Sequence, residues 1–427
     1  MRDRPLLAMG LEEPLIPGEK GPGAKLSASV FVLANTILGA GMLSLPSAFA
    51  ACGWVAAPLM LVGFGAASTV GLIMISECGD AVKRPASFNA VAETAMPGFG
   101  VLFDLAIAIK CFGVATSYLV VVGDSVPKSM VAFGLDGMFL QRRVWVIIGL
   151  CVGAPLAFMK NITALRHTSL AALSCVMLIT VMVVLFAFHP FYPFIDPCPG
   201  DDDFASGCRG PTELFTTPET TLRALPLFVF AYTCHQNMIS ITNELSRPSR
   251  GRCWAVAAIS IGTAIGVYIF LACSGYETFG NKVQSNILSN YPADSMVVAV
   301  ARLMISLVVT FCYPLQAHPS RTCVTNILNT IPVCKQIAPT LLHVIITTCF
   351  VAFTGTIAFL VSDLGLVLSV VGATGSTIVT YVLPGACYFL LFPKRPSRWL
   401  GLAMLLTGTL FICPVSLYLV FNKGAAH

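Results

Sequence analysis

Two ionisable side chains lie inside apolar runs of this sequence, where burying a charge costs free energy. Lys110 stands in AIAIKCFG, and His235 stands among polar neighbours in FAYTCHQNM at 230–238. An ionisable residue in such a segment is a candidate functional group, because its charge responds to its surroundings and it can carry a proton. The alternatives are an ion pair or carbonyl contacts for Lys110, and a neutral imidazole bonded to backbone for His235.

No enzyme signature accompanies these residues. The zinc-protease motif HExxH and the Walker A motif are absent from the sequence, and Val122-Gly123-Asp124 has no Tyr-Asp motif to partner it. The chain is therefore expected to be neither an enzyme nor an ATP-driven pump.

Composition defines the setting of these side chains. The 427 residues are 56% hydrophobic and 11% charged, whereas soluble domains carry about 25% charged residues. Only an integral membrane protein fits, so the net charge of +5 does not indicate a nucleic-acid partner. Most of the 16 cysteines lie in apolar segments and do not form a disulfide framework.

Apolar segments long enough to cross a bilayer recur along the chain, since a spanning helix needs about 20 residues. Eleven are predicted, at 26–50, 54–77, 101–127, 144–159, 167–188, 222–245, 253–274, 295–317, 338–361, 364–392 and 399–421. With a cytosolic N-terminus, the loops on the cytosolic side hold most of the 25 Lys and Arg residues, as the positive-inside rule requires.

The spans form one transmembrane domain, 26–421, between a disordered cytosolic tail, 1–25, and a short C-terminal tail, 422–427. The first tail has no cleavable signal peptide. It contains DRPLL and EPLI, which look like endolysosomal sorting signals, although such short matches also occur by chance. The sequon at Asn161 falls on the cytosolic side and is expected to stay unglycosylated.

One long polar loop, 189–221, is expected on the opposite side of the membrane. It holds Cys198 and Cys208 around an acidic run. That compartment is oxidising, so a Cys198–Cys208 disulfide is predicted, with two free thiols as the alternative.

Two of the spans contain residues that interrupt a helix. NTILGAGMLSLP at 35–46 places Gly39 and Gly41 in mid-span, and a polar cluster follows Pro226 in the segment 225–245. Glycine costs a helix up to about 1 kcal/mol. Broken helices at corresponding places in two halves of a chain indicate a transporter binding site, and the freed N–H and C=O groups suit the carboxylate and ammonium of an amino acid. Close helix packing through small residues is the alternative.

These stretches resemble the amino acid/auxin permease family, in the group of sodium-coupled neutral and vacuolar amino-acid transporters. The matching stretches run in the family's order and include NTILGAGMLSLPSAF, FDLAIAIKCFGVATSYLVVVGD, FAYTCHQNM, GYETFGNKVQSNIL, YPLQAHPSR and DLGLVLSVVGATGST. The resemblance implies an all-α membrane protein of eleven helices, with a LeuT-like 5+5 inverted repeat plus one extra helix.

The resemblance also implies site residues. Substrate contacts are expected from Ile37, Leu38, Gly39, Ala40, Gly41, Gly113, Ser117, Tyr118, Phe230, Tyr232, Cys234 and His235. Ion coupling is expected from Asn35, Thr36, Lys110 and Thr310, with a possible sodium ion at Asn35 and Thr310 and no other metal. The alternatives are a helix–helix hydrogen bond for Asn35 and a bond to its own helix for Thr310.

The resulting hypothesis is a secondary active transporter of neutral or cationic amino acids, coupled to a proton or sodium gradient and needing no other cofactor. Its partners are an amino acid and the lipid bilayer, with no nucleic acid, and we expect a monomer. Lys110 and the sorting motifs favour a vacuolar or endolysosomal membrane over the plasma membrane. The alternative function is a sensor of the same fold that does not transport.

Overall fold

The computed structural model describes residues 24–82, 85–159, 168–188, 197–198 and 208–422. Within these ranges the regular structure is helical, apart from an isolated β-bridge between Ala24 and Leu245. The predicted sorting motifs, the sequon at Asn161, nearly all of the 1–25 tail and residues 423–427 lie outside the described residues.

Fifteen α-helices follow one another along the described chain. The first eight are α1 (Leu26–Ile37), α2 (Leu45–Ala81), α3 (Phe88–Ala95), α4 (Gly100–Ala132), α5 (Arg142–Ala157), α6 (Thr168–Ala187), α7 (Pro218–Ala231) and α8 (His235–Glu244). The others are α9 (Arg250–Phe279), α10 (Met296–Leu328), α11 (Pro339–Leu360), α12 (Leu364–Val371), α13 (Leu383–Leu391), α14 (Arg398–Leu406) and α15 (Cys413–Phe421).

Each predicted span coincides with one or more of these helices. Seven helical stretches among the described residues are long and apolar enough to cross a membrane. The helix α2 joins the end of the first predicted span to the second one, and Gly53 (φ 81°) bends it between them. The fold therefore agrees with an all-α membrane protein, whereas the count of eleven spans and the inverted repeat stay predictions.

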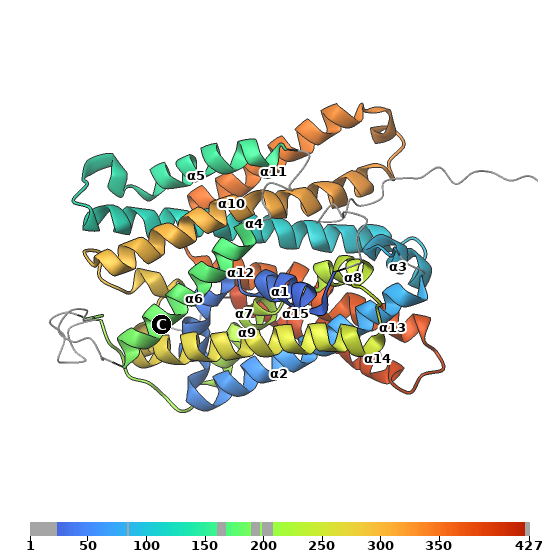
Figure 1. The fold of residues 1–427 in the computed structure, drawn as a ribbon, viewed down its shortest axis with the longest axis horizontal. Coiled ribbons are helices and arrows are strands. Elements are labelled where there is room, and N and C mark those ends of the chain that lie inside the picture. Colours follow the sequence, from blue (N-terminus) through green and yellow to red (C-terminus); the bar gives the residue numbers. More distant parts are fainter. Residues whose placement is uncertain (1–23, 83–84, 160–167, 189–196, 199–207, 423–427) are drawn as a thin grey trace, which may run out of the picture.

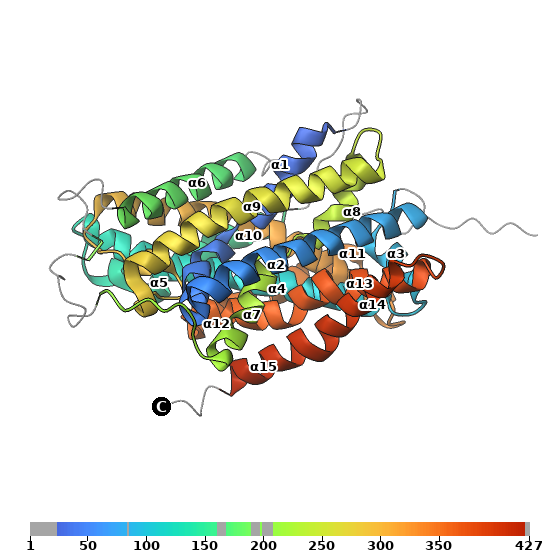
Figure 2. The ribbon, with the colours of Figure 1, turned by 90° about the horizontal axis from the view of Figure 1, so that it is seen from below.

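The helices form two layers with shorter helices between them. In Figure 1, α4, α5, α10 and α11 run together along one side, and α2 and α9 run along the other. Figure 2 shows α2 and α9 side by side across the molecule, with α15 along one edge. The short helices α1, α7 and α8 lie between the layers in Figure 1.

Arg142 of α5 contacts two further helices of the first layer, α4 and α11. Its Nε lies 2.8 Å from the Asp124 carboxylate on α4, and its other nitrogens donate to the carbonyl oxygens of Ala358 and Val361 at 2.9 Å. The guanidinium thereby satisfies carbonyls that the end of α11 leaves without helical partners.

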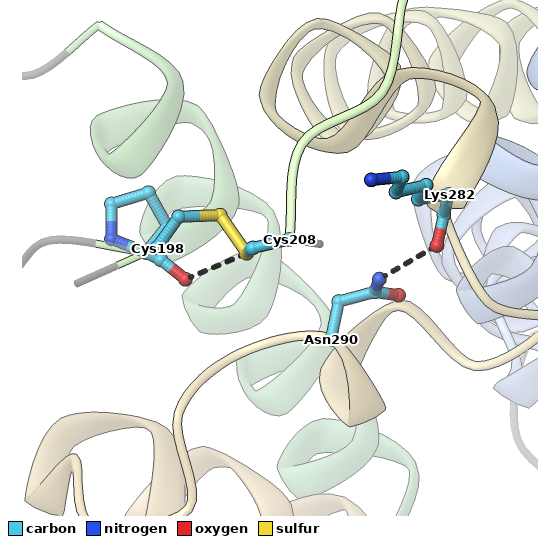
Figure 3. Close-up of a disulfide and its surroundings, with 5 residues drawn as sticks. Cys198, Cys208, Lys282 and Asn290 are labelled. Atoms are coloured by element: carbon cyan, nitrogen blue, oxygen red, sulfur yellow. Dashed lines mark hydrogen bonds between the residues drawn. A yellow bond between two sulfur atoms is a disulfide. The ribbon is translucent and has the colours of Figure 1, made fainter. Parts of the chain in front are cut away.

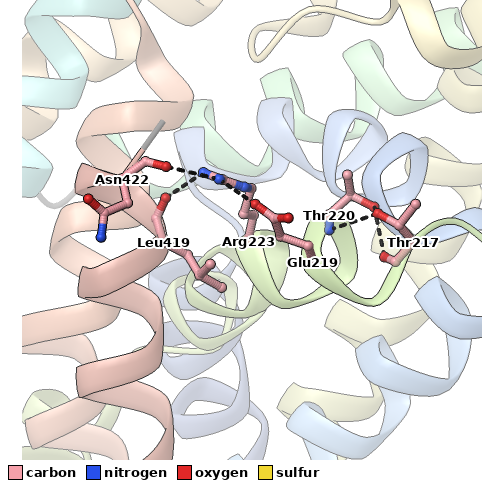
Figure 4. Close-up of polar contacts among 6 residues, drawn as sticks. All are labelled: Thr217, Glu219, Thr220, Arg223, Leu419 and Asn422. Carbon is pink, nitrogen blue, oxygen red and sulfur yellow. Dashed lines mark hydrogen bonds and ion pairs between the residues drawn. The ribbon is translucent and has the colours of Figure 1, made fainter. Parts of the chain in front are cut away.

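Arg223 links α7 to the C-terminal end of α15 (Figure 4). Its guanidinium donates to the carbonyls of Leu419 and, at 3.2 Å, Asn422, and it pairs with Glu219 one turn earlier at 2.7 Å. A cation beside the carbonyls at the end of α15 is favourable because a helix C-terminus carries partial negative charge.

The stretch between α12 and α13 is a continuous helix with two π-helical parts, Gly372–Ser376 and Ile378–Val382. Glycines let it approach its neighbours closely. A Cβ at Gly372 would lie 2.0 Å from the Pro226 carbonyl oxygen of α7. A Cβ at Gly375 would lie 2.8 Å from the backbone nitrogen of Lys110 on α4. This span therefore packs backbone to backbone against both α7 and α4.

Candidate functional site

The first predicted span is broken after one short helix. The helix α1 ends at Ile37, Leu38 and Gly39 leave the helical conformation, and a 3-10 helix covers Ala40–Ser44. A Cβ on Gly39 would meet no atom within 4 Å, whereas one on Gly41 would lie 2.6 Å from the Phe230 ring. The break thus leaves open space at Gly39, where a ligand could reach the backbone.

The second predicted break is also present. The helix α7 ends at Ala231, residues 232–234 are not helical, and α8 begins at His235. The Thr233 hydroxyl returns to the Val229 carbonyl at 2.8 Å and so satisfies one of the carbonyls at the end of α7.

The two breaks face each other. The Phe230 ring lies against Gly41, and the Asn237 side-chain amide donates to the Thr36 hydroxyl at 2.9 Å. The Tyr268 hydroxyl of α9 lies 2.7 Å from the Ile37 carbonyl oxygen and 2.9 Å from that of Ala231. The ends of α1 and α7 therefore meet at one point.

A cavity of about 1500 Å³ opens beside this meeting point. Eleven of the predicted site residues line it: Asn35, Thr36, Ile37, Leu38, Gly39, Ala40, Gly41, Lys110, Ser117, Tyr118 and Phe230. The cavity thus joins the first break, the edge of the second and the middle of α4.

The cavity runs from the breaks towards one end of the molecule. Its wall includes Ala28 near the start of α1 and Asp104 near the start of α4. It also includes Asn329 directly after α10 and Pro339 at the start of α11. These are the helix ends that the sequence assigns to the cytosolic side.

Towards the opposite ends of α4 and α10, three side chains hold the loop 283–292 by hydrogen bonds. The buried Arg302 guanidinium donates to the carbonyls of Leu288, Tyr291 and Pro292 at 2.7–3.2 Å. Lys128 of α4 donates to Ser289 at 2.9 Å, and the Ser44 hydroxyl donates to Ser285 at 2.5 Å. Two helices of the first layer, α4 and α10, and the first break therefore hold this loop.

Lys110 reaches the cavity from α4. It is only 4% exposed, and no carboxylate among the described residues forms an ion pair with it. The buried Cys234, in the second break, is one of its neighbours. A charged ammonium without a counter-ion costs free energy inside a membrane span. The described residues therefore do not support a structural ion pair as the reason for Lys110.

Five predicted residues lie outside the cavity wall. Gly113 packs against Val371, and Cys234 is buried. Tyr232 is buried with its ring 5.6 Å from that of Tyr268. The remaining two, His235 and Thr310, form hydrogen bonds with backbone carbonyls.

His235 points away from the cavity, towards α2. It is fully buried, and its Nε2 lies 3.1 Å from the Ser68 carbonyl oxygen. A Cβ at Gly71 would lie 2.7 Å from Nε2 and 2.7 Å from the Thr380 carbonyl oxygen, so the ring fills a slot between α2 and the π-helical span. In this structure it packs against the backbone.

No hydrogen bond joins Thr310 and Asn35. The Thr310 hydroxyl donates to the Ser306 carbonyl of its own helix at 2.7 Å. The Asn35 side-chain oxygen is buried and has no hydrogen-bond partner among the described residues. The predicted sodium site at these two residues stays a prediction.

The Cys198–Cys208 disulfide is present, as predicted (Figure 3). It lies near Lys282 and Asn290, where the Asn290 side-chain amide donates to the Lys282 carbonyl at 3.1 Å. The disulfide therefore lies beside the segment that Arg302 holds.

The predicted site residues did not include Tyr268, or Gln236 and Asn237 of the polar cluster that follows Pro226. Gln236 and Asn237 follow a predicted residue directly and line the cavity. They could have been included because polar side chains in a broken span need partners. Tyr268 lies in an ordinary apolar run of α9, where no local signal marks it.

Comparison with known proteins agrees with these features. Residues 23–423 match the sequence profile of the family described as Transmembrane amino acid transporter protein. Vacuolar amino acid transporter 5 of Schizosaccharomyces pombe is 39% identical over 86% of this chain and 85% of its own length. Vacuolar amino acid transporter 6 of Saccharomyces cerevisiae is 32% identical over 85% and 89%, and human sodium-coupled neutral amino acid transporter 7 is 26% identical over 86% and 79%.

Proposed function

The chain belongs to the transmembrane amino acid transporter family, and we propose that it is a secondary active transporter that moves amino acids across the vacuolar membrane by alternating access. Its relatives are transporters rather than enzymes, and its fold is that of a multi-pass membrane protein. The observation that carries the proposal is the shared cavity of two broken helices.

A zwitterion matches what the breaks offer. Free N–H and C=O groups at mid-span cost several kcal/mol each if they stay bare. The carboxylate of an amino acid accepts from N–H groups, and its ammonium donates to carbonyls. Open space at Gly39 leaves room for such a ligand beside the backbone.

The conformation described here corresponds to a state open towards the cytosol. The cavity extends to helix ends that the predicted orientation places in the cytosol. At the other end, Arg302 and Lys128 hold the loop 283–292 in place. Alternating access requires that these contacts break while the cytosolic end closes.

For the coupling ion we propose a proton carried by Lys110. Lys110 lines the cavity, and no carboxylate among the described residues forms an ion pair with it. Loss of the proton would remove the cost of an uncompensated buried charge. A sodium ion held by Asn35 and Thr310 is the alternative, but in this conformation the Thr310 hydroxyl bonds its own helix.

The two broken spans also bear on the architecture of the transporter. Eleven spans in a 5+5 inverted repeat plus one would place the two broken spans first and sixth, at matching positions of the two halves. That correspondence and the overlap of every predicted span with helix support this arrangement. We also propose that one chain suffices for transport, because the cavity is built from a single chain.

Uptake of radiolabelled neutral and cationic amino acids into proteoliposomes tests the function, with sodium and proton gradients imposed separately. The proposal predicts uptake driven by the proton gradient and abolished in Lys110→Met, while Lys394→Met, at an exposed loop position, retains it. Uptake driven by sodium, with Lys110→Met unimpaired, would refute the proton coupling. No flux of any amino acid under either gradient would favour a sensor.

A further inference from the structure

Tyr268 occupies a position that no prediction from the sequence assigned. Its side chain is fully buried on α9, and its hydroxyl lies between the carbonyl oxygens of Ile37 and Ala231, at 2.7 and 2.9 Å. These two residues are the last of α1 and of α7. The tyrosine therefore contacts both helix ends at the point where the chain breaks.

A hydroxyl cannot fully satisfy both carbonyls. A tyrosine O–H has one proton to donate, and both of its partners here are acceptors. Each carbonyl has two acceptor positions, and the Gly39 N–H takes one of those at Ile37, at 2.9 Å. These two donors still leave acceptor capacity where the ends of α1 and α7 meet, and both Ile37 and Ala231 belong to the cavity wall.

The electrostatics of this point favour a cation. Helix C-termini carry partial negative charge, and two of them meet here. An ammonium group has three donors and no acceptor, so it requires several carbonyl oxygens held at a fixed separation. The Tyr268 hydroxyl lies within hydrogen-bonding distance of both the Ile37 and the Ala231 carbonyl and so limits the spacing between them.

Building on the amino-acid transport proposed above, we propose that Tyr268 is a positioning residue for the α-ammonium group of the substrate. Its hydroxyl holds the ends of α1 and α7 at the separation that lets their carbonyls accept from one –NH3+ group. The residue acts from behind the cavity wall and does not itself touch the substrate.

A purely structural role would have a different signature. If the hydroxyl only satisfied two buried carbonyls, its loss would lower the stability of the protein and reduce the amount of active transporter. It would not change the concentration at which a given amino acid half-saturates uptake. The KM of uptake, compared with Vmax, therefore separates the two roles.

The test is uptake kinetics of Tyr268→Phe in proteoliposomes. The ring and its packing against Tyr232 are kept, and only the hydroxyl is lost. We expect KM to rise about 3- to 10-fold, as the loss of one hydrogen bond implies, with Vmax within about twofold of wild type. The matched control is Tyr276→Phe on the same helix, whose hydroxyl accepts from the Glu213 amide at 2.8 Å, away from the cavity; its KM should not change.

A competitor that lacks the amine tests whether the effect of Tyr268 depends on the ammonium group. The carboxylic acid that matches the transported amino acid should inhibit wild type and Tyr268→Phe at equal concentrations, because it has no ammonium to be positioned. An unchanged KM in Tyr268→Phe, or a fall in Vmax alone, would overturn the proposal. A wild-type protein that transports no amino acid would instead refute the proposed function.

A second pair of variants covers the case in which Tyr268→Phe does not fold. Tyr268→His keeps a ring donor and Tyr268→Leu has none, so the KM of the His variant should be at least about threefold lower. Equal KM values in this pair would contradict the positioning role.

Discussion

The side-chain amide of Asn237 lies 2.9 Å from the hydroxyl of Thr36 and donates to it. This contact joins the first turn of α8 to the last turn of α1, next to both breaks. At the far ends of the same helices, the Ala24 backbone pairs with Glu244 and Ser246 at 2.8 and 3.0 Å. The short helices α1 and α8 are thus bonded at both ends, and we expect them to move as one unit when the cavity opens and closes.

A double-mutant cycle tests the contact between Asn237 and Thr36. Each of Asn237→Ala and Thr36→Val should raise the KM of uptake several-fold. The double variant should be little worse than either single variant, because both remove the same hydrogen bond, with a coupling of about 0.5–1.5 kcal/mol. Strictly additive effects on KM would show that the two side chains act separately.

Two glycines should separate function from stability. Gly39→Ala adds a methyl group to open space, so the protein should fold with an unchanged melting temperature but lose most uptake, because the methyl occupies the place of the ligand. Gly372→Ala places a methyl 2.0 Å from the Pro226 carbonyl and should lower the melting temperature or prevent folding. Thermal unfolding in detergent and uptake are measured together, and a fully active Gly39→Ala protein would contradict the proposed site.

The stability of the protein should fall even when Arg302 is replaced by lysine. Its buried guanidinium donates to three carbonyls of the loop 283–292, and an ammonium cannot reproduce that planar fork. We expect Arg302→Lys to lower the melting temperature by several degrees. The control is Arg247→Lys, at an exposed position after α8. A melting temperature that Arg302→Lys does not change would show that the contacts to the loop contribute little.

The Cys198–Cys208 disulfide should stabilise the protein without taking part in transport. It closes a loop with a sequence separation of 10 residues, for which the chain-entropy account gives about 2–3 kcal/mol. A Cys198→Ser/Cys208→Ser variant should therefore unfold at a lower temperature with an unchanged KM. A changed KM would mean that the bridged loop influences the binding site.

The sequence predicted both breaks because their signals are local. Glycines in mid-span, and a polar cluster after Pro226, disfavour a continuous helix whatever surrounds them. The face that a side chain presents depends instead on tertiary packing. His235 was expected at the substrate but fills a slot beside Gly71 of α2, and Thr310 bonds its own helix. Tyr268 could not be predicted, because its role arises only when the ends of α1 and α7 meet beside α9.

The most direct test of the central claim is an experimental structure of the protein determined with a saturating concentration of the amino acid that it transports fastest. The account predicts density for one amino acid between the two breaks, with its ammonium near the Ile37 and Ala231 carbonyls and its main chain beside Gly39. Density bound elsewhere, with the space at Gly39 empty, would contradict the claim that the broken helices form the substrate site.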